Sequence, residues 1–154
     1  MKLPDPQSSP FSALISDIEK GLIKIPQFQR DFVWDLTKSA NLMDSIVKGY
    51  PIGTFIFWKT KERLRSIRNI GGVELPEPIA GDFVYFVLDG QQRLTSLFAS
   101  LKGITIQREN GNEDDYSKMY LDLEASEDDL IVILDIENRN SKSYIRLTDL
   151  LYGG

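Results

Sequence analysis

Five consecutive residues carry side chains suited to phosphate chemistry: Asp89, Gly90, Gln91, Gln92 and Arg93. They follow six apolar residues, 83–88, and precede apolar residues at helical spacing, so we expect a buried strand to run into a helix here. A helix start exposes backbone N–H groups that have no intrahelical acceptor and that favour an anion. Gly90 would let a ligand approach the backbone, and Arg93 would add a two-pronged donor. The junction is therefore a candidate anion site.

The same junction also has a purely structural interpretation. Asp89 is a suitable N-cap, and Gln92 stands three residues later, where it would complete a capping box. Arg93 would then be a solvated side chain. Short motifs often occur by chance, so the residues alone leave both interpretations open.

A second polar segment lies upstream, in residues 26–34. It places three aromatic residues beside Gln29 and Arg30 without any clear period. In one interpretation the aromatic residues fill the core and Arg30 pairs at the surface with Asp31 or Asp35. In the other, the segment is a loop that contacts a ligand. Both remain open at this point.

The elements around these segments follow from hydrophobic periodicity. We expect helices at residues 10–20, from 35 to about 48, and from 90 to 102, followed by a left-handed cap at Gly103. Strands are expected at residues 22–25, 54–58, 83–88, 104–106, 119–123 and 130–136, with a polar loop at 109–116 and a further helix from 147. This order predicts an α+β fold with a small mixed sheet flanked by helices, in a single domain of residues 1–154.

The composition excludes several kinds of site. The chain has no cysteine and no histidine, which excludes disulfides, thiolate or histidine-bound zinc, a Ser-His-Asp triad and a histidine-dependent nuclease site within these residues. Magnesium bound by carboxylates stays open. The N-terminus has no secretory signal and no apolar run is long enough to span a membrane, so we expect a cytoplasmic protein without a membrane partner.

Charge is unevenly distributed along the chain. The net charge of −5 divides into +2 for residues 1–103 and −7 for residues 104–154. Phosphate contacts dominate nucleic-acid affinity, so any nucleic-acid contact is expected in the first two thirds. Residues 59–68 are basic, and form either a nucleic-acid patch or a solvated strand end or short helix. Clustered carboxylates at 114–115 and 127–129 lack EF-hand spacing, and we interpret them as solvated loops.

Three segments together resemble the N-terminal domain of the GmrSD family of modification-dependent restriction proteins. They are residues 25–34, residues 49–54, and residues 88–95 with their D-G-Q-Q-R sequence. The resemblance covers residues 10 to 152. That family is similar to the ParB and sulfiredoxin fold, in which a G-x-x-R turn at a helix start holds nucleotide phosphates. The matching turn here runs from Gly90 to Arg93.

The resemblance implies a domain that binds or hydrolyses a nucleoside triphosphate, with Mg²⁺, in defence against phage. The nucleotide-binding residues that it implies are Gln29, Arg30, Gly90, Gln91, Gln92, Arg93 and Thr95. Asp89 and Gln92 would be catalytic, Gln92 by orienting a phosphate oxygen or a water, and Asp89 would hold the metal or cap the helix.

The resemblance further implies that an HNH-type nuclease lies in another domain or subunit, and that this chain is the N-terminal part of a longer protein. DNA would then be contacted by the full-length protein. A second function stays open: a DNA-binding or protein-docking module without nucleotide turnover, in which residues 59–68 follow the DNA backbone. A ParB-like phosphodiester nuclease is a third.

Overall fold

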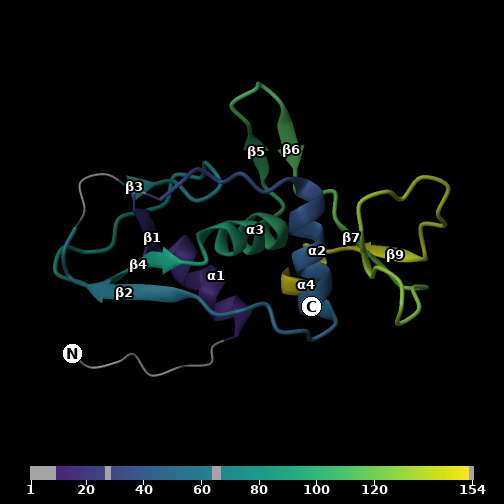
Figure 1. The fold of residues 1–154 in the computed structure, drawn as a ribbon, viewed down its shortest axis with the longest axis horizontal. Coiled ribbons are helices and arrows are strands. Elements are labelled where there is room, and N and C mark those ends of the chain that lie inside the picture. The colour runs from purple at the N-terminus through teal and green to yellow at the C-terminus, as the bar shows by residue number, and fades with distance from the viewer. Residues whose placement is uncertain (1–9, 27–28, 64–66, 153–154) are drawn as a thin grey trace.

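The computed structural model has an α+β architecture and describes residues 10–26, 29–63 and 67–152. Residues 27 and 28 of the upstream motif and residues 64–66 of the basic segment therefore lie outside the described residues. In Figure 1 a four-stranded and a three-stranded sheet lie at opposite ends of the molecule, with α2 (Leu36–Val47) and α3 (Gln91–Lys102) between them. The expected class, α+β with a small mixed sheet flanked by helices, is confirmed. The ParB and sulfiredoxin likeness stays a prediction.

The four-stranded sheet carries the strand that leads into the candidate site. Its order is β2 (Ile56–Thr60), β4 (Val84–Asp89), β1 (Ile23–Pro26) and β3 (Ile67–Arg68). β4 pairs in parallel with β1 and antiparallel with β2, while β1 and β3 are antiparallel. The sheet is therefore mixed, and β4 lies inside it.

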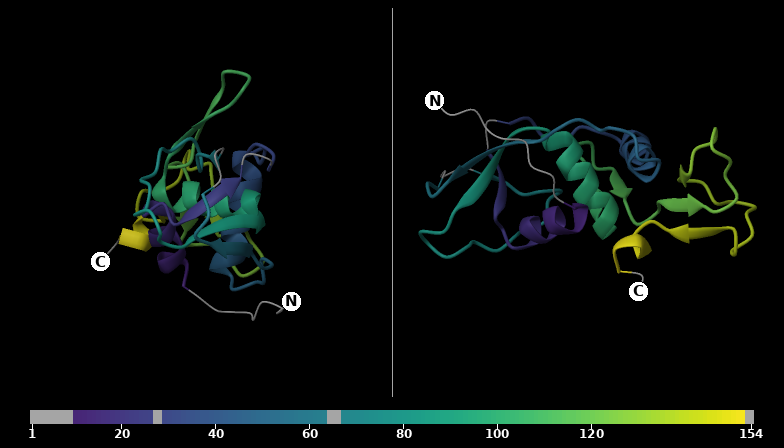
Figure 2. Two further views of the ribbon diagram at one scale, coloured as in Figure 1. Left: turned by 90° about the vertical axis from the view of Figure 1, so that its left-hand side faces the viewer. Right: turned by 90° about the horizontal axis from the view of Figure 1, so that it is seen from below.

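Helices α1 (Phe11–Glu19) and α3 supply much of the core beside this sheet. The right view of Figure 2 shows both helices along one side of the sheet. Apolar residues at helical spacing turn one stripe of α1 inward, as the sequence predicts. The helix α3 is different, because other elements cover it on nearly all sides and only Arg93 and Lys102 are not buried. The core includes Ile15, Ile18, Ile23, Ile25, Val87, Leu94, Leu97 and Phe98. None of the helices in the described part of the chain is long and apolar enough to cross a membrane.

The central strand begins and ends one residue later than expected. Its first residue, Val84, and its middle residues Phe86 and Val87 are fully buried. The strand end is different, because Leu88 is 45% exposed. Burial on both faces therefore holds for the middle of β4, and the chain emerges at the surface as it reaches Asp89.

The chain after α3 forms two smaller sheets. Gly103 caps α3 in the left-handed region, with φ 69°, as expected. β5 (Thr105–Gln107) and β6 (Glu113–Asp115) form a hairpin that stands away from the body in Figure 1. The loop expected at residues 109–116 thus contains a strand, because its acidic residues pair across to β5.

The last sheet has the order β8 (Val132–Ile133), β7 (Tyr120–Asp122) and β9 (Tyr144–Arg146), and α4 (Asp149–Tyr152) follows it. β9 is not among the expected strands, since three residues are too few to show a period. The carboxylate of Asp44 in α2 joins this sheet to the body. Its Oδ1 accepts from the N–H groups of Ile131 at 2.6 Å and Val132 at 3.1 Å.

Candidate functional site

The turn between β4 and α3 is built around Gly90. Gly90 is the N-cap of α3 and has φ 94° and ψ 14°, a left-handed conformation that glycine adopts without strain. A Cβ atom at this position would lie 2.6 Å from Cδ1 of Phe55. The expectation that Gly90 leaves room beside the backbone is therefore incomplete, because the space on its Cβ side is filled by Phe55.

The capping-box interpretation is wrong. Asp89 is the last residue of β4, and the N-cap position makes no side-chain hydrogen bond to the helix. The side chain of Gln92 is directed elsewhere: Nε2 donates to the carbonyl of Asp31 at 2.8 Å, and Oε1 accepts from the N–H of Val33 at 2.9 Å. Gln92 therefore holds a distant segment rather than its own helix start.

That segment is the strap, which we define as residues 29–35. Gln91 at the start of α3 also binds it, since Nε2 donates to the carbonyl of Arg30. In return, Nε2 of Gln29 donates to the carbonyl of Leu88 at 3.3 Å. Both α3 glutamines are nearly buried, with 6% and 8% of their surface exposed. The two polar motifs of the sequence therefore bind one another.

Arg93 binds the loop at residues 49–54 to the start of α3. Its Nη1 and Nη2 atoms donate to the carbonyls of Ile52 and Thr54, both at 2.8 Å. Its guanidinium also lies over the ring of Phe55, 5.1 Å from the centroid. Arg93 is therefore not a solvated side chain, because both prongs of its fork are used by a loop. Residues 49–54, residues 29–35 and the D-G-Q-Q-R turn all meet at the start of α3.

Two charged groups at this junction stay exposed, Arg30 and Asp89. Within the described part of the chain, the Arg30 side chain pairs with neither Asp31 nor Asp35, so the surface ion pair considered above is absent. Trp34 stands beside them, half-buried, with Nζ of Lys38 4.7 Å from the centre of its ring. Among the described residues that line this place, Arg30 is thus a cation whose side chain is exposed and forms no ion pair.

These residues border a hollow of about 250 Å³, which we call the motif pocket. Its lining consists of Gln29, Arg30, Trp34, Asp89, Gly90, Gln91, Gln92 and Arg93. The structure thus brings together every site residue that we expected from the sequence except Thr95. That residue lies in the second turn of α3, is 1% exposed, and does not line the pocket. Trp34 joins the site from the strap.

The start of α3 contributes partial positive charge to this pocket. The first helical bond runs from the N–H of Leu94 to the carbonyl of Gly90 at 2.9 Å, so the N–H groups of residues 91–93 have no intrahelical acceptor. Such groups, together with the helix dipole, favour an anion. In the described residues, no cluster of three acidic side chains is placed to hold a metal ion. Asp89 is the carboxylate that lines the pocket.

The strap is also held from its other side, by Arg108 at the end of β5. Nη2 of Arg108 donates to the carbonyl of Trp34 at 2.8 Å and Nη1 to that of Phe32 at 3.3 Å. Nε donates to Oδ2 of Asp114 at 2.7 Å, and the guanidinium lies 5.0 Å from the ring centre of Phe32. Sequence reasoning missed Arg108, because no spacing links it to the strap.

A buried chain of hydroxyl groups ties Arg108 to both long helices. Nη2 of Arg108 donates to the hydroxyl of Tyr116 at 3.3 Å, and that hydroxyl lies 3.0 Å from Oγ of Ser39. Ser39 in turn lies 2.9 Å from Oγ of Ser96 in α3. Burial raises the pKa of the Tyr116 phenol, so it stays protonated and can donate at neutral pH. The hairpin, α2 and α3 therefore form one hydrogen-bonded support for the strap.

The fold and the site define an α+β domain with a polar pocket at a helix start, closed by a strap and a loop that the helix itself binds. The chain belongs to the family of N-terminal domains of GmrSD restriction endonucleases, whose family model matches residues 11–151. It is also 35% identical over 92 residues to an uncharacterized protein of Methanocaldococcus jannaschii. That match covers 57% of this chain and 16% of the relative, so the chain spans a small part of that protein's length.

Proposed function

We propose that this domain binds the phosphate groups of a nucleoside triphosphate in the motif pocket and thereby regulates a nuclease located outside the chain. The membership of a restriction endonuclease family supports the setting, a modification-dependent system that acts against phage DNA. The nuclease domain or subunit, its DNA substrate and the regulation of the nuclease by this domain are all parts of this proposal.

The proposal rests on one observation: the start of α3 and the exposed side chain of Arg30 border the same pocket. Free N–H groups and a guanidinium are the donors that phosphate oxygens need. The volume of about 250 Å³ is below the roughly 300–1,000 Å³ of pockets that enclose whole ligands. The pocket therefore suits phosphates, and the base and ribose would extend past Trp34.

Asp89 would bring the metal to this arrangement. Mg²⁺ binds through one or two carboxylates together with phosphate oxygens and water, so an exposed aspartate at the pocket is a sufficient protein ligand. Bound there, the ion would neutralise phosphate charge. Hydrolysis would further require a group that orients water, and Gln92, the residue that the motif offers, already has both ends of its amide bound to the strap.

The decisive variant is Arg30→Ala. The Arg30 carbonyl accepts from Gln91 through the backbone, so that hydrogen bond survives removal of the side chain. Calorimetric titration with ATP and with GTP, with and without Mg²⁺, should show roughly tenfold or weaker binding for the variant, as expected for the loss of one charge-assisted contact. Its melting temperature without nucleotide should not change.

Arg63→Ala is the matched control, since Arg63 is also an exposed arginine but lies away from the pocket and contacts the carbonyl of Lys61. It should bind nucleotide like the wild type. Equal affinities for the wild type and Arg30→Ala would refute this placement of the phosphates. Binding of duplex DNA in place of nucleotide, weakening steeply as salt is raised, would favour the DNA-binding alternative.

A further inference from the structure

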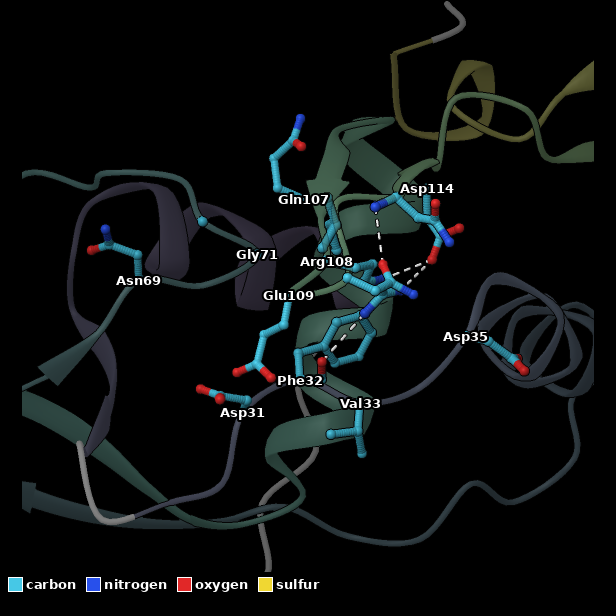
Figure 3. Close-up of a pocket in the computed structure, with 14 residues that line it drawn as sticks. Asp31, Phe32, Val33, Asp35, Asn69, Gly71, Gln107, Arg108, Glu109 and Asp114 are labelled. Atoms are coloured by element: carbon cyan, nitrogen blue, oxygen red, sulfur yellow. Dashed lines mark hydrogen bonds and ion pairs between the residues drawn. The ribbon is translucent and has the colours of Figure 1, made fainter.

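A larger hollow lies on the hairpin side of the strap, and no step of the proposed nucleotide function uses it. We call it the hairpin groove. It has a volume of about 830 Å³ and is bordered by the strap, by the turn at residues 69–72 and by residues 106–114 of the hairpin. Figure 3 shows Glu109 extending from the hairpin toward the strap, and Arg108 beside Phe32 and Asp114. Most of its lining residues are exposed, so the groove is open along its length.

The groove is rich in hydrogen-bond acceptors and in negative charge. Four carboxylates line it, those of Asp31, Asp35, Glu109 and Asp114, against a single guanidinium, that of Arg108. That guanidinium is already bound to Asp114 and to two strap carbonyls, so it offers a ligand little attraction. Glu109 is exposed and forms no ion pair within the described residues. Amides at 69, 107, 110 and 112 add further carbonyl oxygens.

This charge excludes anions and favours cations. A phosphate in the groove would face several carboxylates, and the described residues that line the groove offer it no unpaired cation. Like charges at close range are unfavourable even near a protein surface. The floor is partly apolar, with Phe32, Ile106 and the 59% exposed side chain of Val33. Arginine and lysine have the complementary form, an apolar stem that packs on such a surface and a charged head that reaches acceptors.

We propose that the hairpin groove is a docking site for a basic segment of a partner polypeptide. An open groove of this size fits an extended peptide better than an enclosed small molecule, and its excess of carboxylates fits arginine or lysine side chains. Arg108 shows the same chemistry within the chain, because its guanidinium is held by a carboxylate, by carbonyls and by the ring of Phe32. The proposal does not depend on nucleotide binding, which concerns the motif pocket.

The probe is a capped peptide of alternating glycine and arginine, titrated calorimetrically into the whole chain at physiological salt, where the screening length is about 8 Å. Glu109→Lys places a positive charge in the groove and should weaken binding roughly tenfold. Glu109 is an exposed loop residue, so the variant should fold. Glu127→Lys changes the net charge equally at an exposed position outside the groove and should bind like the wild type.

Two further probes separate charge from shape. The same peptide with citrulline in place of arginine keeps the shape without the charge and should bind at least roughly tenfold more weakly. A peptide with glutamate in place of arginine should not bind. The proposal is overturned by no binding of the arginine peptide, by equal loss in Glu109→Lys and Glu127→Lys, or by citrulline binding as tightly as arginine. Duplex DNA binding that Glu109→Lys strengthens would instead assign this face to nucleic acid.

Discussion

The side-chain amide of Gln92 pairs with the backbone around Val33 as a neighbouring strand would. Oε1 accepts from the N–H of Val33 at 2.9 Å, and Nε2 donates to the carbonyl of Asp31 at 2.8 Å. A single side chain thus satisfies one donor and one acceptor of a segment 59 to 61 residues away. The D-G-Q-Q-R turn therefore helps to assemble the pocket, because its side chains hold the strap in place.

Gln92→Glu should make stability depend on pH in a way that the wild type does not. The ionised carboxylate cannot donate to Asp31, so we expect a loss of about 1–3 kcal/mol at neutral pH. The protonated carboxyl restores both hydrogen bonds, so its pKa is raised in the folded state and the loss shrinks as pH falls toward about 5. Denaturant unfolding at both pH values is the measurement. Gln92→Leu has no group that can be protonated in this range, so its loss of stability should be the same at both pH values. If Gln92→Leu regained as much stability at the lower pH as Gln92→Glu, the pairing would be contradicted.

Arg93→Ala should destabilise the protein as well as weaken any nucleotide binding. The substitution leaves the carbonyls of Ile52 and Thr54 without their donor and removes the contact with Phe55, which should cost about 1–3 kcal/mol. Arg30→Ala provides the contrast, with weaker binding at unchanged stability. The pair is compared by thermal melting and calorimetric titration. If the melting temperature of Arg93→Ala equalled that of the wild type, the hydrogen bonds from Arg93 to the loop would not be needed for stability.

Gly90→Ala tests the fit of the turn against Phe55. The added Cβ meets that ring at 2.6 Å and also forces a side chain into a positive φ, so we expect a cost of about 2–4 kcal/mol. Gly49→Ala is the matched control, since Gly49 has φ 76° but nothing within 4 Å of its Cβ position. It should lose about 1 kcal/mol from backbone strain alone. Similar losses in both variants, measured by denaturant unfolding, would argue against the contact.

Asp44 should make the attachment of the last sheet sensitive to acid. Burial raises its pKa, but the ion pair with Lys48 at 2.8 Å and the N–H groups of Val132 and Ile131 outweigh this and hold the pKa below its usual value. A depressed pKa stabilises the fold above the unfolded value of about 3.9, and this contribution is lost as pH falls through the lower folded value.

Asp44→Ala should cost about 2–4 kcal/mol at neutral pH, because it leaves two N–H groups without their acceptor. The difference from the wild type should narrow below about pH 4. Unfolding measured from pH 7 to pH 3 checks both statements. Asp128→Ala, at an exposed position, serves as the control and should follow the wild-type curve. A constant difference across this range would show that the Asp44 charge does not contribute.

The sequence by itself determined the three long helices and the buried strand that leads into α3. Periodicity located α1, α2 and α3, Asp35 caps α2 by accepting from the N–H of Lys38 at 2.7 Å, and Gly103 ends α3 in the left-handed region. These features depend on neighbours within one or two turns, so local residue types suffice to predict them. The short strands β3 and β9 and the hairpin strand β6 were not predicted, because such strands are defined by their partners and not by a period.

Only the tertiary structure decided which side chains of the polar motifs stay exposed at the motif pocket and which bind other segments of the chain. Gln91, Gln92 and Arg93 all look available in the sequence, yet their donors bind carbonyls of residues 39 to 61 positions away. Arg30, equally polar, keeps its side chain exposed. The difference arises because a hydrogen bond is settled by which segments pack together, and no local pattern specifies that. The same packing placed Arg108 behind the strap and left Glu109 facing an open groove.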